Sequence, residues 1–212
     1  MALKVAVLPI TPMAQNCSIL VDEASGRAAV VDPGGEVARI RAALSELGVT
    51  AEKILLTHGH IDHAGGAAEL AEALAIPVEG PNQADEFLLK RLDKAGAQFG
   101  MPEARPVTPD RWLAEGDRVE FGGLSLDVLQ VPGHTPGHVV FVHGPSRLAV
   151  VGDTLFAGSV GRTDLPYGDG ELLLSGIKGK LLPLGDDFNI LPGHGPASTI
   201  GRERQSNPFL QG

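Results

Sequence analysis

Four apolar, strand-like runs in this chain each end in a loop that carries histidine or aspartate side chains. The densest loop, residues 57–63, reads Thr-His-Gly-His-Ile-Asp-His. Residues two apart in an extended segment point to the same side, so His58 and His60 form a pair. Asp62 and His63 stand where helix-forming residues begin, and a turn there can bring them back toward this pair. Crowded imidazoles repel one another when protonated and are left unsatisfied when buried alone. A divalent cation removes both problems, so the sequence predicts a metal site at a strand end.

Three further loops each place one candidate ligand after an apolar run. His134 lies in Val-Pro-Gly-His-Thr-Pro-Gly-His, Asp153 in Gly-Asp-Thr and His194 in Leu-Pro-Gly-His-Gly. A single Gly-Asp-Thr is an ordinary turn. Four strand-to-loop junctions that all carry His or Asp are far more specific, because loops at strand ends are where α/β sheets present their chemistry. We expect these side chains to be the remaining ligands.

With these residues in this order, the chain resembles the metallo-β-lactamase superfamily and, within it, the glyoxalase II-like hydrolases. The likeness extends over nearly the whole chain, through Asn16-Cys17 and residues 31–35, 135–138, 158–164 and 203–210. It implies one domain over residues 1–212. It also implies the α/β fold of that superfamily, an αββα sandwich in which two mixed β-sheets are flanked by helices.

The resemblance further implies a role for each candidate ligand. The first of two divalent metal ions per chain would be held by His58, His60 and His134. The second would be held by Asp62, His63 and His194, and Asp153 would bridge the two. Zinc is the expected metal, and iron or manganese would also suit the site because histidine and carboxylate accept all three.

The function implied is hydrolysis of 2-hydroxyacyl thioesters of glutathione, such as S-lactoylglutathione, by attack of a metal-bridging hydroxide. Asp62 would bind the second metal and accept the proton of the bridging water as the catalytic base. Arg162 is a candidate for binding an anionic group of the substrate, and the alternative is an ordinary surface ion pair.

The end of the chain departs from the family pattern. Full-length glyoxalase II enzymes have a C-terminal helical domain that supplies basic residues for glutathione, whereas only residues 195–212 follow the last candidate ligand here. Pro196 stands where the family has a tyrosine. Arg162, Arg202 and Arg204 are candidates to replace the missing contacts.

One alternative belongs to a different class of enzyme. Persulfide dioxygenases share this fold and the stretch Gly-Arg-Thr-Asp at residues 161–164, but they use a single iron held by two His and one Asp. By the family pattern, that iron would lie on His58, His134 and Asp153. The ligands of the second metal all remain in this sequence, which favours the hydrolase.

Charge and composition limit the classes of partner that the chain is expected to bind. The net charge of −9 argues against a nucleic-acid groove, which needs a basic face. No apolar stretch approaches the length of a membrane span, and the first nine residues lack the apolar core of a signal peptide. Cys17 is the single cysteine, so no disulfide can form within the chain. We expect a cytoplasmic monomer or small homo-oligomer whose partner is a small-molecule thioester.

Hydrophobic periodicity predicts alternating strands and helices. Strands are expected near residues 3–9, 17–22, 27–32, 53–56, 118–122, 124–130, 138–143, 148–152 and 187–191. Helices are expected near 36–47, 64–75, 83–97 and 169–182, and an irregular connector near 101–111.

Several other residues have open roles. Asp32 either orients a ligand histidine or only shapes the turn before Pro33, and Trp112 and Tyr167 either line a pocket or pack. His138 is expected behind the ligands or in the core, His143 exposed in a turn, and Leu172–Leu174 in the core. Cys17 is not expected to be a nucleophile, because metal-activated water supplies one.

Overall fold

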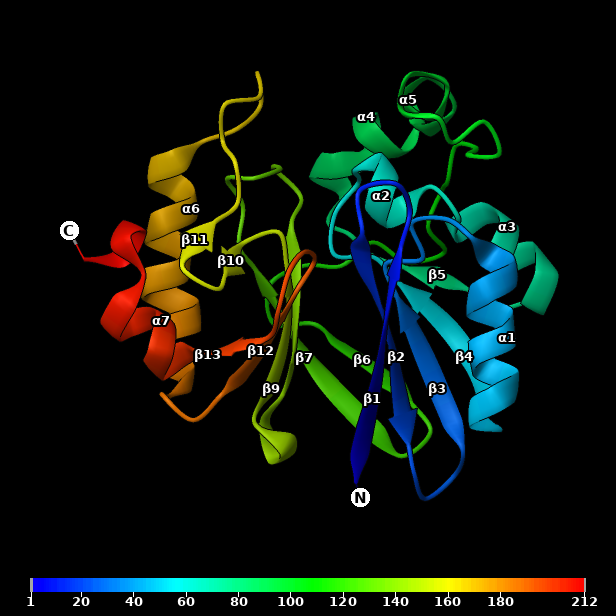
Figure 1. Cartoon of the computed structure of the whole chain (residues 1–212), viewed down its shortest axis with the longest axis horizontal. Helices are drawn as coiled ribbons and strands as arrows, with labels where there is room; N and C mark the ends of the chain where they lie inside the picture. The colour runs from blue at the N-terminus through cyan, green and yellow to red at the C-terminus, as the bar shows by residue number, and fades with distance from the viewer. Residues whose placement is uncertain (1, 212) are drawn as a thin grey trace.

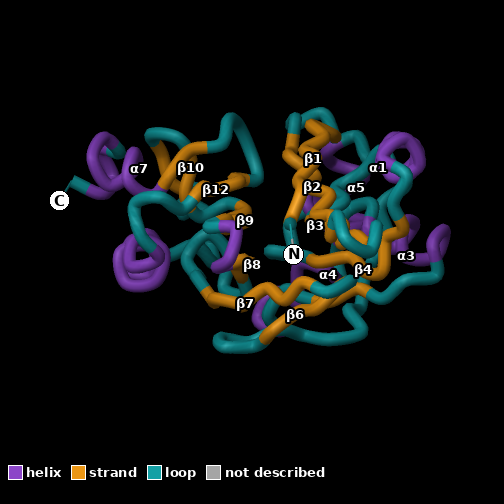
Figure 2. Tube along the Cα trace, turned by 90° about the horizontal axis from the view of Figure 1, so that it is seen from below, coloured by secondary structure: helices purple, strands orange, loops and turns teal. Residues whose placement is uncertain are grey.

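The computed structural model describes residues 2–211, which form four layers. Two β-sheets pack face to face, and each is covered on its outer side by helices. Figure 1 shows this order from left to right as α6 and α7, the six-stranded sheet, the five-stranded sheet, and α1 with α3. The same layers are visible from below in Figure 2. The predicted αββα sandwich is therefore confirmed.

The five-stranded sheet is built by the first part of the chain. Its order is β1-β2-β3-β4-β5, with β1 to β3 antiparallel and β3 to β5 parallel, so the sheet is mixed. The strands are β1 (Leu3–Ile10), β2 (Gln15–Asp22), β3 (Arg27–Val31), β4 (Thr50–Leu55) and β5 (Val78–Glu79). The accompanying helices are α1 (Val37–Leu47), α2 (Ile61–Ala64), α3 (Ala67–Leu74), α4 (Glu86–Leu89) and α5 (Leu92–Phe99).

The six-stranded sheet is built by the second part. Its order is β13-β12-β9-β8-β7-β6, and only the pair β12 and β9 is parallel. The strands are β6 (Arg118–Phe121), β7 (Leu124–Gln130), β8 (Val139–His143), β9 (Leu148–Gly152), β12 (Asn189–Pro192) and β13 (Ser198–Thr199). A small hairpin joins β10 (Leu155–Phe156) to β11 (Ser159–Val160), and the helices are α6 (Gly170–Gly176) and α7 (Ile200–Ser206).

Alternation along the central strands explains the layers, because successive side chains of a strand point to opposite faces. In β8, Phe141 faces the core between the two sheets, whereas Val140 and Val142 face the core under α6 and α7. Phe121 and Phe141 are among the largest fully buried side chains. Burial of a side chain of this size contributes roughly 1.5–3 kcal/mol, so the core between the sheets fixes their relative position.

Two of the predicted helices are interrupted, and long-range contacts explain both interruptions. The helix expected over 83–97 breaks between α4 and α5, because the carbonyl of Leu89 accepts from the amide of Val107 rather than from the next helical turn. The helix expected over 64–75 starts earlier and is divided into α2 and α3 at Gly65–Gly66. There the amide of Gly66 donates to Pro33, and a Cβ on Gly65 would lie 2.7 Å from the carbonyl oxygen of Gly34.

The helix expected over 169–182 is shorter and continues differently. α6 ends at Gly176 and the chain runs on through one π-helical turn, Ile177–Leu181. Of the leucine run, Leu173 is fully buried but Leu172 is 45% exposed, so the prediction that all three leucines lie in the core was wrong. Only one side of α6 packs into the core.

His143 also differs from its prediction. It was expected in an exposed turn, but it is the last residue of β8 and is 4% exposed. His143 pairs with Leu148 of β9, so β8 continues up to the turn and includes this residue. Within residues 2–211, no helix is long and apolar enough to cross a membrane.

Candidate metal centre

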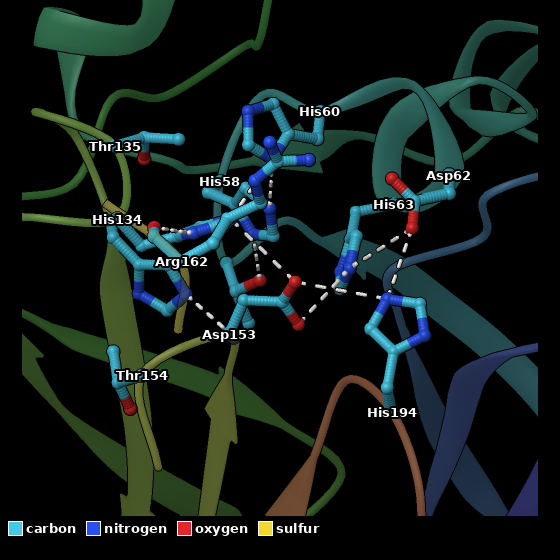
Figure 3. Close-up of polar contacts among 12 residues, drawn as sticks. His58, His60, Asp62, His63, His134, Thr135, Asp153, Thr154, Arg162 and His194 are labelled. Atoms are coloured by element: carbon cyan, nitrogen blue, oxygen red, sulfur yellow. Dashed lines mark hydrogen bonds and ion pairs between the residues drawn. The ribbon is translucent and has the colours of Figure 1, made fainter. Parts of the chain in front are cut away.

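The four predicted loops meet at one edge of the sandwich. The loop after β4 and the start of α2 carry His58, His60, Asp62 and His63, and the six-stranded sheet contributes the other three candidates, His134, Asp153 and His194, directly after β7, β9 and β12. Figure 3 shows these seven side chains pointing toward a common centre. The structure therefore brings together every candidate ligand predicted from the sequence.

Three histidines form the first trio. Nδ1 of His60 lies 3.0 Å from Nε2 of His58 and 3.0 Å from Nε2 of His134. Three ring nitrogens at this separation converge on one point and could hold one metal ion. Because no carboxylate belongs to it, the first trio is a purely imidazole site.

The second trio contains a carboxylate. Oδ2 of Asp62 lies 3.0 Å from Nε2 of His194 and 3.8 Å from Nε2 of His63. These three atoms also converge closely enough to hold a metal ion. His194 is the most accessible of the three, with 31% of its side chain exposed.

Asp153 lies between the two trios. Its Oδ1 is 3.4 Å from Nε2 of His63, and its Oδ2 is 3.6 Å from Nε2 of His134 and 3.7 Å from Nε2 of His194. One carboxylate thus has one oxygen toward the second trio and the other toward both.

In His134 and His63, the ring nitrogen that points away from the trio forms a hydrogen bond that suits metal binding by the other nitrogen. Nδ1 of His134 lies 2.8 Å from the carbonyl oxygen of Arg162, which can only accept, so the proton is on Nδ1 and Nε2 is bare. Nδ1 of His63 likewise carries a proton, because it lies 2.9 Å from a carboxylate oxygen of Asp32. Nε2 of His63 and Oδ1 of Asp153 are buried without any hydrogen-bond partner. Buried polar atoms rarely remain unsatisfied, so a cation accounts for both orphans.

Electrostatics separate the two trios. Burial holds the pKa of His58 well below its usual value, and burial together with His134 and His63 lowers the pKa of His60 to about 3. Burial also lowers the pKa of His134. The first trio is therefore neutral without a cation.

The second trio is charged. Burial opposes protonation of His63, but the carboxylates of Asp153, Asp62 and Asp32 raise its pKa well above the usual value. The hydrogen bond to Asp62 raises the pKa of His194. Burial acts against ionisation of Asp62, and the neighbouring His63 and His194 nevertheless lower its pKa. Without a cation, this trio is a set of ion pairs.

Asp32 is the residue that orients ligands in both trios. Its Oδ2 accepts from Nδ1 of His63 and from the hydroxyl of Thr57, whose oxygen lies 3.0 Å from Nδ1 of His58. Its Oδ1 accepts from the amide of Thr57 at 2.7 Å. Asp32 has φ +52°, a left-handed conformation uncommon for non-glycine residues. Of its two open roles, the orienting role is the one the structure supports.

His138 lies behind the candidate ligands, as expected. Its Nε2 accepts from the amide of Asp153 at 3.0 Å, and its ring stacks on that of His58 with centroids 4.8 Å apart. Two glycines make room for this packing. A Cβ on Gly152 would lie 2.6 Å from Nε2 of His138, and one on Gly193 would lie 2.2 Å from Oδ1 of Asp153.

Asp85 was not predicted from the sequence. This buried carboxylate accepts from the amides of Gly59 and Gly137 and from the hydroxyl of Thr135, so it ties the loop after β4 to the loop after β7. Burial raises its pKa to about 6, although the three hydrogen bonds oppose this. Asp85 lies in a polar segment without a recognisable motif, and only the long-range contacts reveal it.

The arginines fall into two groups. Arg162 lies at the site, where its carbonyl holds His134, and its exposed guanidinium forms a two-pronged ion pair with Asp164. Arg204 is held by Asp186 and by the carbonyl of Leu182 under α7. The guanidinium of Arg204 therefore contacts residues that precede β12 rather than the candidate ligands. Cys17 is buried in the core, and burial raises the pKa of its thiol, which agrees with the expectation that it is not a nucleophile.

Comparison with known proteins identifies the family to which the chain belongs. The model of the metallo-beta-lactamase superfamily matches residues 10–194, and the chain belongs to that superfamily. Hydroxyacylglutathione hydrolase GloC of Haemophilus influenzae is 43% identical over 209 residues, which cover 98% of each chain.

Two solved structures share the whole fold. The BLEG-1 B3 metallo-beta-lactamase has a TM-score of 0.91 at 33% identity and covers 99% of this chain and 100% of its own. TTHA1623 in a di-iron-bound form has a TM-score of 0.88 at 38% identity and covers 97% and 100%. The resemblance inferred from the sequence is confirmed for superfamily and fold.

Proposed function

We propose that this chain is a dinuclear metal-dependent hydrolase of 2-hydroxyacyl-glutathione thioesters such as S-lactoylglutathione. The observation that carries the proposal is the position of Asp153, whose two oxygens face two separate trios of ligand atoms. The similarity to the hydroxyacylglutathione hydrolase supports the substrate class.

In this proposal one cation would be held by His58, His60 and His134, the other by Asp62, His63 and His194, and Asp153 would be available to both. When bound, the cations supply a water of near-neutral pKa and polarise the substrate carbonyl. Asp62 is ionised because its pKa is lowered. Its role as the catalytic base rests on its position, since its Oδ2 lies within 3.8 Å of Nε2 of both His63 and His194. A thiolate is a good leaving group, which suits a site without a strong general acid.

Arg162 is the proposed contact for a carboxylate of the thiol carrier. Its backbone is fixed by His134, and its guanidinium already has a carboxylate partner in Asp164. A substrate carboxylate would replace Asp164 in the same two-pronged geometry, which arginine favours.

The test combines metal analysis with two assays on the purified protein. We expect close to two metal ions per chain, turnover of S-lactoylglutathione, and no oxygen uptake with glutathione persulfide. His143→Gln is a matched control for loss of a histidine outside the site, and it should retain both cations. Metal binding without thioester turnover would overturn the substrate class, and failure to bind metal would overturn the whole proposal.

The second candidate is a mononuclear iron persulfide dioxygenase that uses His58, His134 and Asp153. One observation favours iron, because the related TTHA1623 structure holds a di-iron centre. Persulfide-dependent oxygen uptake by the iron-loaded protein would replace the hydrolase with this candidate.

A further inference from the structure

His60 differs from the other histidines of the site in its partner. The rings of His134 and His63 each face an oxygen that can only accept, from Arg162 and Asp32 respectively. Nε2 of His60 instead lies 2.8 Å from the hydroxyl of Tyr167. A phenolic hydroxyl can either donate or accept.

The ring of His58 is fixed through Thr57. The hydroxyl of Thr57 donates to Asp32, so its oxygen is left to accept from Nδ1 of His58. Nε2 of His58 is therefore bare, as is Nε2 of His134. Both of these nitrogens lie 3.0 Å from Nδ1 of His60. Three bare lone pairs cannot share such a space, so either a proton on Nδ1 of His60 or a cation must lie among them.

Each of these two states requires the opposite behaviour from the partner of Nε2. With the proton on Nδ1 of His60, Nε2 is bare and needs a donor. With a cation bound to Nδ1, Nε2 carries the proton and needs an acceptor. The ring stays neutral in both states, with one proton relocated from Nδ1 to Nε2 by exchange with solvent.

We propose that Tyr167 is a positioning residue whose hydroxyl serves both states of His60, donating to Nε2 before a cation binds and accepting from Nε2 afterwards. This inference rests on the proposed metal centre but not on the identity of the substrate. The tyrosine lies in the segment between β11 and α6, where no motif marks it.

The surroundings of Tyr167 keep its hydroxyl in place. Its ring packs edge-on against Phe87 of α4, with centroids 5.3 Å apart. Phe87 is 40% exposed, so the two rings form an apolar rim beside His60. Phe87 belongs to α4, in the first part of the chain, and Tyr167 belongs to the segment between β11 and α6, in the second part. The two rings therefore connect the two parts of the chain beside His60.

The decisive measurement is the tautomer of His60, read from nitrogen-15 NMR of the imidazole rings. In the metal-free protein we expect the proton on Nδ1, and in the zinc-loaded protein on Nε2. His58 and His134 should keep the proton on Nδ1 in both states. The same tautomer for His60 in both states would overturn the proposal.

Tyr167→Phe removes the hydroxyl and keeps the ring. We expect about a tenfold loss of zinc affinity at the first trio, the lower end of what loss of a hydrogen bond behind a metal ligand costs. Affinity is measured by competition with a chromophoric chelator. Phe87→Leu is the matched control, because it alters the ring contact and keeps the hydroxyl, and it should switch tautomer as the wild type does.

The outcomes separate the two proposals. If Tyr167→Phe is folded and binds zinc with wild-type affinity, Tyr167 only packs and the inference fails. If Phe87→Leu loses as much affinity as Tyr167→Phe, the loss is not specific to the hydroxyl and the inference fails. If the wild type shows the switch but does not hydrolyse S-lactoylglutathione, the proposed substrate fails and Tyr167 keeps its role.

Discussion

The two trios of the candidate metal centre are neighbours, yet they differ in charge. The first trio contains three histidines whose pKa values are lowered, so it is neutral and ready for a cation. In the second trio the pKa values of both histidines are raised, and their partner is an ionised aspartate. Cation binding therefore releases protons from the second trio but releases no net proton from the first, where the proton of His60 only moves between ring nitrogens. The difference predicts a strong site that fills first and a second site controlled by pH.

The largest effect should follow from removal of the group that both trios share. Asp153→Ala should lose both cations and reduce thioester turnover by several orders of magnitude, because it leaves His63 and His134 without their common carboxylate. Metal content and kcat/KM measure this. Full turnover by the variant would contradict a dinuclear centre.

Removal of the second trio alone should separate the two sites. His63→Ala and His194→Ala should each retain the first cation and still reduce thioester turnover by orders of magnitude. The double variant should be no worse than either, since the residues act as one unit. A one-iron dioxygenase would keep its ligands, so oxygen uptake that withstands both substitutions would favour that enzyme instead.

Asp32→Asn should weaken the second trio in a different way. The amide would place a donor against Nδ1 of His63, which favours a proton on Nε2 and blocks the nitrogen that faces the cation. We expect affinity at the second trio to fall by about 10- to 100-fold, the usual cost of changing a ligand's hydrogen-bond partner. Asp22→Asn is the control, because Asp22 is equally buried but bonds Ser25 and Gly123 instead. Equal metal affinities of Asp32→Asn and Asp22→Asn would show that Asp32 does not support the second trio.

The dependence on pH should also distinguish the trios. Below the raised pKa of His63 or His194, each proton that a cation must displace makes binding at the second trio about tenfold stronger per unit rise in pH. Binding at the first trio should depend less on pH, because the pKa values of its histidines are lowered. The contribution of His63 to the stability of the metal-free protein should change with pH in the opposite direction. Because the folded-state pKa of His63 is raised, its stabilising effect is present at low pH and is lost as pH rises through that pKa. Metal content and thermal unfolding between pH 5 and 9 measure both, and parallel curves for the two sites would contradict the charge difference.

The smallest effect is expected outside both trios. Arg162→Ala should raise KM about two- to fivefold and spare kcat, as loss of an exposed charged contact does. Asp164→Asn frees the guanidinium and should lower KM. If neither change alters KM, the substrate carboxylate is not bound at Arg162.

Features that depend on neighbouring residues could be predicted from the sequence, whereas features that depend on distant residues could not. The candidate ligands follow apolar runs directly, so local pattern was sufficient to find His58, His134 and His194. The nine longer strands were found for the same reason, whereas the two-residue strands β5, β10, β11 and β13 were not predicted. Asp85 could not be found, because its partners Gly59 and Gly137 are 26 and 52 residues away.

The errors have the same physical origin. The break between α4 and α5 depends on an amide donated by Val107, and no property of residues 83–97 indicates it. His143 was misplaced because Gly144 and Pro145 indicate a turn, whereas the residue before them still pairs with Leu148 of β9 and is buried. The role of Asp32 remained open because its acceptors are filled by Thr57 and His63, which are 25 and 31 residues away.

The meeting of the four loops has a consequence for the order in which the chain assembles. Each trio takes ligands from both halves of the sandwich. His58 and His60 need His134, and Asp62 and His63 need His194. Neither half could complete either trio alone, so a nascent chain would complete both trios only after the last strands emerge and dock. A bound cation would then act as a cross-link added at the end of folding, and a chelator would loosen the seam between the sheets before it disturbed either layer.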